Sequence, residues 1–591
     1  MRRSIRVVIA TSDEPRPDGS PDQSPDQSPD GLLDQPPGRR AQSLSRTAGG
    51  ECFPDASTRA SRGPDRDNPL VGWGAAIGIA LMGLFLRLWH LGEPEAFSFD
   101  ETYYAKDAWS LLNHGYAKGY VDDADKLILG GRATDLWKPE PSLAVHPDVG
   151  KWLIALGEKS FGLDPFGWRV SAAVVGSLMI LVMCRFVGRL TGSTLLGCVG
   201  GLLLSLDGLQ LVLSRLALLD IFAAFFLLCG VHCLVADRAW FRRRMASLAR
   251  LDRGGRVDAN QPWGPVRGLL LRPWLLAGGA AFGLAIGTKW TALYPLAAFG
   301  ILVWAWSAGA RRSFGVRWSV PRSALVDGVP AFLHLVGVGL AVYVATWTGW
   351  LVHAHEYEQS LSNTQYTTFE GGKQWPTALE PDADGVGEAV QSLRSLAYYH
   401  LDVYTFHTSF LNDSTHPYSS KPAGWPLLNR PVGVDAQLDI LPGTQGCDAP
   451  AGDTCQRQVL LLGNPLVWWG GCLALLWGLA RWLGARDWRY GLALVGVGST
   501  WLPWLQYDDR PIFLFYAIMM LPFLVLALTL MLGQIVGTAR GPSPRRTVGV
   551  IVAGSFVVLS LLCFAWFWPI WTDVLLTRGE WTDRMWFLRW I

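Results

Sequence analysis

The chain has 591 residues, of which 50% are hydrophobic, and it contains 30 tryptophans. Apolar runs of about 20 residues recur along most of its length, which is what a helix needs to cross a hydrocarbon core of roughly 30 Å. This pattern excludes a soluble globular protein, and the formal net charge of only +2 gives no indication of a nucleic-acid partner.

The N-terminal residues 1–68 are polar and rich in proline, aspartate, serine, glycine and arginine, and they include the near-repeat PDQSPDQSPD. No apolar period in them could build a core, so we predict a disordered tail. The short apolar piece VVIA near the start is too brief for the hydrophobic part of a signal peptide, and no signal peptide is predicted.

The apolar runs that follow predict an all-α polytopic membrane protein with eleven transmembrane helices. The predicted spans are 70–90, 168–188, 193–213, 216–236, 273–291, 293–309, 326–346, 460–480, 490–506, 512–533 and 548–569. In an alternative topology, the closely spaced pair around Lys289 forms one re-entrant element, with one span fewer.

The distribution of arginine and lysine predicts the orientation of these spans. Four basic segments, 238–272, 311–322, 481–489 and 540–546, all fall on the same side of the predicted membrane. The positive-inside rule makes that side cytoplasmic, so the N-terminal tail lies inside and the C-terminus outside. We therefore predict a multi-pass protein of the plasma membrane, with an active site on its extracytoplasmic face.

The same topology divides the chain into four parts. These are the cytoplasmic tail 1–68, an N-terminal catalytic membrane module 69–346 that includes an outer segment 91–167, an extracytoplasmic loop region 347–459, and a C-terminal four-helix module 460–591. Functional residues are expected in the two outer segments, because only these long polar stretches have room for substantial chemistry.

The nine cysteines have no paired CxxC or Cys/His spacing of the kind that holds a metal, and no metal site is predicted. Cys447 and Cys455 stand apart because both lie in the polar segment predicted to face the oxidising side. They are candidates for a disulfide, with two free thiols as the equal alternative.

Adjacent carboxylates, Asp100 and Glu101, open the first outer segment directly after the first span. A carboxylate near the membrane surface, shielded from water by aromatic neighbours such as Tyr104, can have a raised pKa and act as a general base toward a hydroxyl. The alternative is a solvated acidic helix start with Asp100 as its N-cap.

The same outer segment ends in an amphipathic stretch that contains His146, Asp148 and Lys151. Taken alone, it is more typical of an interfacial helix with a snorkelling lysine than of a catalytic element.

Three cations lie at short helix connections on the predicted outer side: Arg215, Lys289 and Arg510. Charged groups at membrane depth are costly and usually mark a functional path. Together these three could stabilise a phosphate at the interface. For Arg215 the equal alternative is an ion pair with Asp220 that staples two helices together.

The sequence contains no GxxxxGK[ST] loop, so a soluble nucleotide is not indicated. A lipid-phosphate sugar donor delivered within the membrane would suit an enzyme that works outside the cytoplasm.

Five ordered motifs resemble those of protein O-mannosyltransferases, from about residue 70 to the C-terminus: FDETYY (99–104), HPDVGKWLIALGEKSFG (146–162), DGLQLVLSRLALLDIF (207–222), GTKWTALY (287–294) and DDRPIFLFY (508–516). The resemblance implies a C-type membrane glycosyltransferase fold. It also implies inverting transfer of a single mannose from polyprenyl-phosphate-mannose to Ser or Thr hydroxyls of secreted or exported, unfolded proteins.

The resemblance also implies roles for individual residues. Asp100 would be the base and Glu101 would orient or bind. Arg215, Lys289 and Arg510 would bind the donor phosphate. The supporting residues would be His146, Lys151, Tyr104 and Asp220, the acid that follows Arg215.

Two departures from the family pattern matter. The usual His-Pro-Pro reads His146-Pro147-Asp148 here, which adds an acid of unknown purpose. Residues 347–459 have no room for the large sugar-binding-like module of eukaryotic members, so the chain resembles a bacterial-type member.

Two alternative functions remain at this point. The same fold could transfer a sugar from a polyprenyl phosphate to a lipid or polysaccharide, or the chain could be a transporter or lipid flippase. The lack of repeated halves and the crowding of polar motifs on one face disfavour transport. A divalent cation is not indicated, and association with the protein-export translocon is left open.

Overall fold

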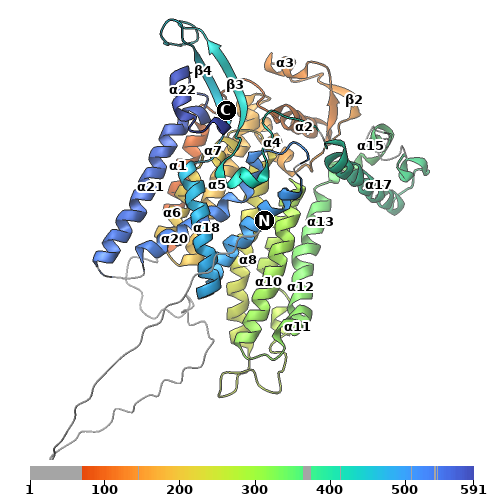
Figure 1. The fold of residues 1–591 in the computed structure, drawn as a ribbon. Helices are drawn as coiled ribbons and strands as arrows, with labels where there is room; N and C mark the ends of the chain where they lie inside the picture. The colour runs from red at the N-terminus through yellow and green to blue at the C-terminus, as the bar shows by residue number, and fades with distance from the viewer. Residues whose placement is uncertain are drawn as a thin grey trace, which may run out of the picture. The chain divides into compact units, whose positions relative to one another are not determined.

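The computed structural model describes residues 69–591 except 144, 364–373, 413, 508, 538–540 and 542. These residues belong to one compact unit. The predicted disordered tail and Asp508 of the fifth motif lie outside the described residues. The described part is mostly helical, as the apolar runs predict, and its polar segments add two small antiparallel sheets (Figure 1).

Eight helices among the described residues are long and apolar enough to cross a membrane. They are α1 (Pro69–Leu88), α5 (Pro165–Thr191), α8 (Leu219–Leu248), α9 (Pro273–Ile286, preceded by the turn η1, Arg267–Leu269), α10 (Leu293–Ser313, preceded by η2, Trp290–Ala292), the run Ser319–Ala345, α18 (Pro465–Ala485) and α21 (Pro544–Trp571). Several begin with a side-chain cap followed by proline, as where Asp164 accepts a hydrogen bond from Gly167 N at the start of α5.

Three of the predicted spans are shorter helices, so the predicted count of eleven spans is not confirmed. They are α6 (Thr194–Ser205) followed by α7 (Gly208–Leu213), α19 (Trp488–Trp501) followed by η8 (Leu502–Gln506), and α20 (Leu521–Val536) preceded by η9 (Leu514–Met519). The 12 residues of α6 reach only ~18 Å, less than a hydrocarbon core.

A buried aspartate explains why the span 193–213 is broken. Asp207 leaves the helical conformation and caps α7 by accepting a hydrogen bond from Gln210 N at 3.1 Å. Its other carboxylate oxygen accepts hydrogen bonds from Asn464 N at 2.9 Å and from Trp468 Nε1 at 2.8 Å. An interior carboxylate with these partners is stable where α6 ends.

The pair of apolar runs around Lys289 forms two separate helices, α9 and α10. With their flanking turns, the two runs have 20 and 24 residues, each long enough to cross a membrane. The structure therefore contains no short re-entrant element there.

The run Ser319–Ala345 is one continuous helix with two π-helical turns. Its parts are α11 (Ser319–Ser323), η3 (Ala324–Gly328), α12 (Val329–Phe332), η4 (Leu333–Gly337) and α13 (Val338–Ala345). It packs closely against α9, where a Cβ at Gly279 would lie 2.2 Å from the carbonyl oxygen of His334. Only glycine permits this approach, which fixes one wall of the bundle.

The two polar segments fold over one end of the bundle (Figure 1). Residues 91–167 form α2 (Glu101–His114), β1 (Lys118–Tyr120), α3 (Ala124–Leu129), β2 (Trp137–Pro141) and α4 (Val149–Phe161), with β1 paired to β2. Residues 347–459 form α14 (Thr348–Val352), α15 (Ala354–Leu361), η5 (Pro376–Leu379), α17 (Val386–Thr405), η6 (Phe406–Phe410), η7 (Pro422–Leu427) and β3 (Val432–Ile440).

A three-stranded sheet joins this second polar segment to the C-terminus. Strand β4 (Cys455–Leu461) lies between β3 and β5 (Leu576–Thr577), all antiparallel, and α22 (Arg578–Arg584) and η10 (Leu588–Trp590) follow. A disulfide links Cys447 to Cys455 across the β3–β4 connection, with the Cα atoms 5.7 Å apart.

Candidate active site

A cavity of about 340 Å³ lies at the end of the bundle that carries the polar segments. Its walls come from the start of α8, the connection between α9 and α10, η6, η8, η9 and the residues Tyr507 and Arg510. We call it the cation-lined cavity. Its lining residues are His146, Asp220, Lys289, Trp290, Thr291, Leu293, Tyr294, Tyr404, His407, Thr408, Pro503, Trp504, Tyr507, Arg510, Tyr516 and Met519.

Lys289 and Asp220 form a buried ion pair in this cavity. Lys289 Nζ lies 2.8 Å from Asp220 Oδ2, and both side chains are less than a tenth exposed. Asp220 occupies the first turn of α8, where the helix dipole favours an acid, and Lys289 has an extended backbone between α9 and α10. The ammonium also lies 4.8 Å from the centre of the Tyr516 ring. These contacts fix the lysine head in the cavity wall.

Arg510 provides the second cation and is held by a histidine. Its Nη1 donates to the carbonyl oxygen of His407 at 2.9 Å and lies 3.1 Å from His407 Nδ1. The His146 ring stacks on His407, with 5.9 Å between ring centres. Burial, reinforced by Arg510, lowers the pKa of His407 to about 3, and burial also holds the pKa of His146 well below its usual value. Both histidines are therefore neutral at physiological pH.

Asp100 lies near the cavity through Tyr104, whose ring centre is 6.1 Å from that of His146. It precedes α2 in the N-cap position, yet its side chain makes no capping hydrogen bond. Instead its Oδ2 accepts a long hydrogen bond from the Tyr104 hydroxyl at 3.4 Å. Burial raises the pKa of Asp100 to about 6, while the charge of Lys289 opposes that rise and the charge of Asp220 adds to it. The carboxylate is thus a proton acceptor with a pKa close to neutrality.

The neighbouring Glu101 has different surroundings. It is completely buried, and Arg169 on α5 grips it with two hydrogen bonds, Nε to Oε1 at 2.9 Å and Nη2 to Oε2 at 2.8 Å. Its oxygens also accept hydrogen bonds from the backbone N–H groups of Ser98 and Ala217, each at 2.9 Å. Both carboxylate oxygens of Glu101 thus accept two hydrogen bonds each. Glu101 stabilises the start of α2 and does not line the cavity.

Arg215 is also placed away from the cavity wall. Its guanidinium donates to three carbonyl oxygens at the end of α1, those of Arg87 at 3.0 Å, His90 at 3.1 Å and Trp89. Helix ends leave such carbonyls without partners, and the arginine satisfies them. The alternative ion pair between Arg215 and Asp220 does not form, because Asp220 pairs with Lys289.

Lys151 belongs to a third buried cluster. Its ammonium lies 3.1 Å from Asp107 and 3.3 Å from Asp148, and its side chain is 1% exposed. It is therefore not the snorkelling lysine that the amphipathic pattern favours. The same contacts give Asp148, the unexpected acid after Pro147, a defined partner, because it shares the charge of Lys151. The contact of Lys151 with Asp107 joins α4 to α2.

The structure thus separates the predicted site residues into two groups. Asp220, Lys289, Arg510 and His146 line the cavity, with Asp100 and Tyr104 next to them. Glu101, Arg215 and Lys151 each complete a buried polar cluster elsewhere. Among the described residues, no three His, Cys, Asp or Glu side chains are grouped so as to hold a metal ion.

Sequence reasoning missed several residues of the site, above all His407, Tyr516 and Arg169. His407 lies in the long polar segment 347–459 without a recognisable motif, and only its contact with Arg510 identifies it. Tyr516 closes the fifth motif, so its place beside Arg510 was a usable signal. Arg169 lies in an apolar span, where a lone arginine could have suggested a buried partner.

The fold has a counterpart among solved structures. The complex described as the Saccharomyces cerevisiae protein O-mannosyltransferase Pmt1-Pmt2 bound to the sugar donor aligns with a TM-score of 0.61 and 14% identity, covering 88% of this chain and 93% of that one. At this identity the likeness concerns the fold alone. The fold is that of a membrane glycosyltransferase.

Sequence comparisons define the family. Residues 77–249 match the model of dolichyl-phosphate-mannose-protein mannosyltransferases, and residues 392–590 match the model of the C-terminal four-helix membrane region of protein O-mannosyltransferases. A polyprenol-phosphate-mannose–protein mannosyltransferase of Mycolicibacterium smegmatis is 35% identical over 525 residues, 88% of this chain and 93% of that protein. Proteins with the same name from Mycobacterium tuberculosis and Corynebacterium glutamicum are 34% and 30% identical, covering 88% and 87% of this chain and 92% of each relative. This chain belongs to the protein O-mannosyltransferase family.

Proposed function

We propose that the protein transfers a single mannose from polyprenyl-phosphate-mannose to Ser or Thr hydroxyls of exported proteins, and that it does so at the cation-lined cavity. The names of the relatives supply the donor and the acceptor class. The observation that carries the proposal is the position of Asp100, a carboxylate with a raised pKa, within the electrostatic reach of Lys289 and Asp220.

The cavity suits the phosphate of such a donor. Lys289 and Arg510 supply two positive charges, and neither of the two neighbouring histidines adds a third. Asp220 orients the Lys289 side chain, and the ammonium balances the charge of the Asp220 carboxylate. The remaining N–H groups of Lys289 are still donors toward the cavity. Trp290, Leu293 and other apolar side chains line the remaining wall, which suits the isoprenoid chain.

The reaction is a direct displacement. The acceptor oxygen forms a bond to the anomeric carbon of mannose while the bond from that carbon to the phosphate oxygen breaks, and polyprenyl phosphate leaves with the bonding electrons. Asp100 takes the hydroxyl proton, while Lys289 and Arg510 stabilise the charge that develops on the leaving phosphate. Because the acceptor attacks and the phosphate leaves on opposite faces of the anomeric carbon, the configuration at that carbon is inverted.

Asp220 is the less suitable base of the two carboxylates near Lys289. Its Oδ2 is committed to the lysine ammonium at 2.8 Å, and proton uptake there would break that ion pair. Asp100 has only a long contact with a neutral hydroxyl at 3.4 Å. A proton on Asp100 therefore costs less, which favours it as the acceptor of the hydroxyl proton.

We further propose that the cavity opens on the extracytoplasmic side. The basic connection 249–272 joins the ends of α8 and α9 that lie farthest from Asp220 and Lys289, and the positive-inside rule assigns such a segment to the cytoplasm. A membrane-impermeant maleimide should label a cysteine introduced at exposed Gln445 in intact cells, and should not label one at Asp252. The reverse pattern would contradict this orientation.

The activity itself can be tested with purified protein, polyprenyl-phosphate-mannose and a threonine-rich peptide. Mass spectrometry should detect one added hexose on the peptide, and NMR of the product should give the anomeric configuration opposite to that of the donor. Membrane lipids and polysaccharide are offered in parallel reactions. Mannose on a lipid or polysaccharide, with none on the peptide, would contradict the proposed acceptor.

A further inference from the structure

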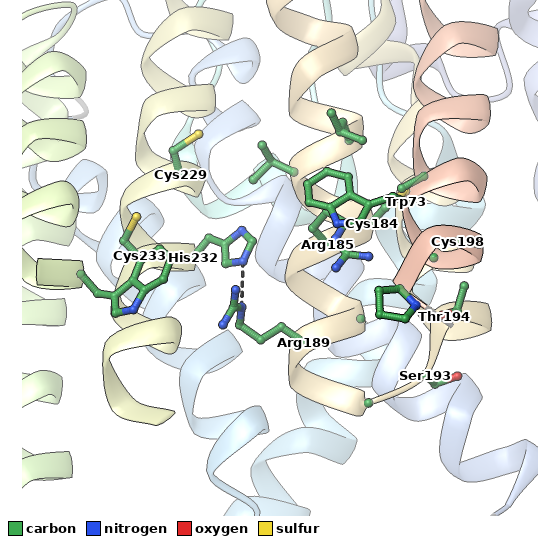
Figure 2. A pocket seen from close by; sticks show the side chains of 18 residues that line it. Trp73, Cys184, Arg185, Arg189, Ser193, Thr194, Cys198, Cys229, His232 and Cys233 are labelled. Carbon is green, nitrogen blue, oxygen red and sulfur yellow. Dashed lines mark hydrogen bonds between the residues drawn. The ribbon is translucent and has the colours of Figure 1, made fainter. Parts of the chain in front are cut away.

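A second cavity, of about 600 Å³, lies at the other end of the bundle. Its walls are the start of α1, the end of α5, the start of α6, the middle of α8 and the start of α9, as Figure 2 shows from close by. Trp274 in its wall begins α9, whereas Lys289 of the cation-lined cavity follows the opposite end of that 14-residue helix. The helix separates them by ~20 Å, and the two cavities share no lining residue.

Two arginines one helical turn apart on α5 dominate this second cavity. The Arg185 guanidinium lies 4.3 Å from the Trp73 ring centre, and that of Arg189 lies 5.7 Å from the Trp274 ring centre. Arg189 Nε donates to His232 Nε2 at 3.0 Å, the dashed line in Figure 2. In the part of the chain that the structure describes, no ion pair involves either arginine. The cavity therefore carries net positive charge.

The rest of the wall is apolar or small. It includes Ala76, Leu181 and Val182, together with the cysteines 184, 198, 229 and 233. Gly72 lies against its polar part, because a Cβ there would be 3.2 Å from Arg185 Nη1 and 3.3 Å from Thr194 Oγ1. A cationic mouth above an apolar interior is complementary to an amphiphile with an anionic head.

The position of this cavity identifies the kind of amphiphile. Trp73 and Trp274, 45% and 39% exposed, lie within the first five residues of α1 and α9, at the level where tryptophan marks a membrane–water interface. Lipid headgroups occupy this level, and the guanidinium fork matches phosphate oxygens in geometry and charge. Two arginines that have no acidic partner among the described residues are stabilised at such a depth when a phosphate joins them.

We propose that this cavity binds the phosphate headgroup of an anionic phospholipid from the leaflet opposite the catalytic cavity. Arg185 and Arg189 hold the phosphate and the Thr194 hydroxyl lies within reach of it. An acyl chain follows the apolar wall between α1 and α5. The bound lipid takes no part in the transfer reaction. It bridges the ends of the helices that line this cavity.

Native mass spectrometry of the full-length protein, delipidated in detergent and titrated with phosphatidylglycerol or phosphatidylcholine, tests this site. We expect wild-type protein to retain one phosphatidylglycerol at concentrations where it retains no phosphatidylcholine. The double variant Arg185→Gln/Arg189→Gln, which removes both charges but leaves a polar amide at each position, should retain phosphatidylglycerol about 30-fold less, as the loss of two basic groups facing an anionic lipid implies. Arg312→Gln, which removes an exposed arginine at the same end of the bundle on α10, is the matched control and should bind like wild type.

Two further measurements distinguish binding of an anionic phospholipid from binding of other compounds that carry a phosphate. Polyprenyl phosphate and soluble glycerol phosphate are offered as competitors, and we expect neither to displace phosphatidylglycerol at equal concentration. Donor turnover of the double variant in lipid-free detergent should equal that of wild type. Equal retention of phosphatidylglycerol by the double variant, or displacement by polyprenyl phosphate, would overturn the proposal, as would a loss of donor turnover in lipid-free detergent.

Discussion

Glu101 and Asp100 are neighbours in the chain, and the structure implies opposite consequences for their loss. In Glu101→Gln, the amide keeps one oxygen but turns an NH₂ group toward either Ala217 N–H or Ser98 N–H. Two of the four hydrogen bonds to this side chain, which are all 2.8 or 2.9 Å long, are lost on that side. Arg169 is then left charged, fully buried and without its carboxylate.

The expected cost is about 3–5 kcal/mol, the range found when one partner of a buried ion pair is removed. The thermal transition in detergent, followed by the fluorescence of the tryptophans, should therefore fall clearly below that of wild type. Turnover per folded molecule, measured well below that transition, should stay within about tenfold of wild type because Glu101 touches no cavity residue. The matched comparison is Arg169→Gln, which also removes hydrogen bonds to the carbonyl oxygens of Pro94 and Ala96 and should lower the thermal transition at least as far.

The opposite pair of results would refute this reasoning. If Glu101→Gln unfolds at the wild-type temperature yet loses more than a hundredfold in turnover, Glu101 acts on the reacting groups. The ion pair with Arg169 would then be a feature of the resting state only.

Three other predictions concern the cavity and the β3–β4 hairpin. Since Asp100 must be deprotonated to accept a proton, kcat/KM should be lost as pH falls through about 6. The variant Tyr104→Phe removes a hydrogen bond that lowers the pKa of Asp100, so the acidic limb of the pH profile should move to higher pH. An acidic limb that does not move would contradict the assignment of this limb to Asp100. Arg510→Gln should raise the KM for the lipid donor at least tenfold, measured with peptide saturating, and an unchanged KM would separate this arginine from the phosphate. Cys447→Ser should weaken the β3–β4 connection locally by about 2–3 kcal/mol and speed its proteolysis, while mannosyl transfer stays at the wild-type rate; lost transfer would place the hairpin in the reaction.

Much of the site follows from local sequence. Lys289 and Arg510 interrupt apolar runs, and a charge in such a place must face a cavity or a partner. Asp100 could be identified because an acid between a membrane helix and aromatic residues is unusual. The helical membrane fold follows from the lengths of the apolar runs, and the resemblance to the family is confirmed over most of the chain.

The remainder depends on contacts between residues far apart in the chain. Arg169 and Glu101 are 68 positions apart, and Arg215 meets the end of α1 more than 120 positions earlier. No periodicity encodes such partners, so the expected roles of Glu101 and Arg215 in the reaction came from the resemblance to the family and not from their contacts. The same reason explains the short α6, because the acid that ends it is stabilised by a residue 257 positions later.

The most direct test of the proposed mechanism is single-turnover mannosyl transfer by the variant Asp100→Asn, with donor binding measured in parallel. The asparagine keeps the size of the side chain but cannot accept the hydroxyl proton. We expect the transfer rate to fall by about 10²–10⁴, with donor affinity and thermal stability close to those of wild type. Transfer within tenfold of the wild-type rate would contradict the role of Asp100 as the base.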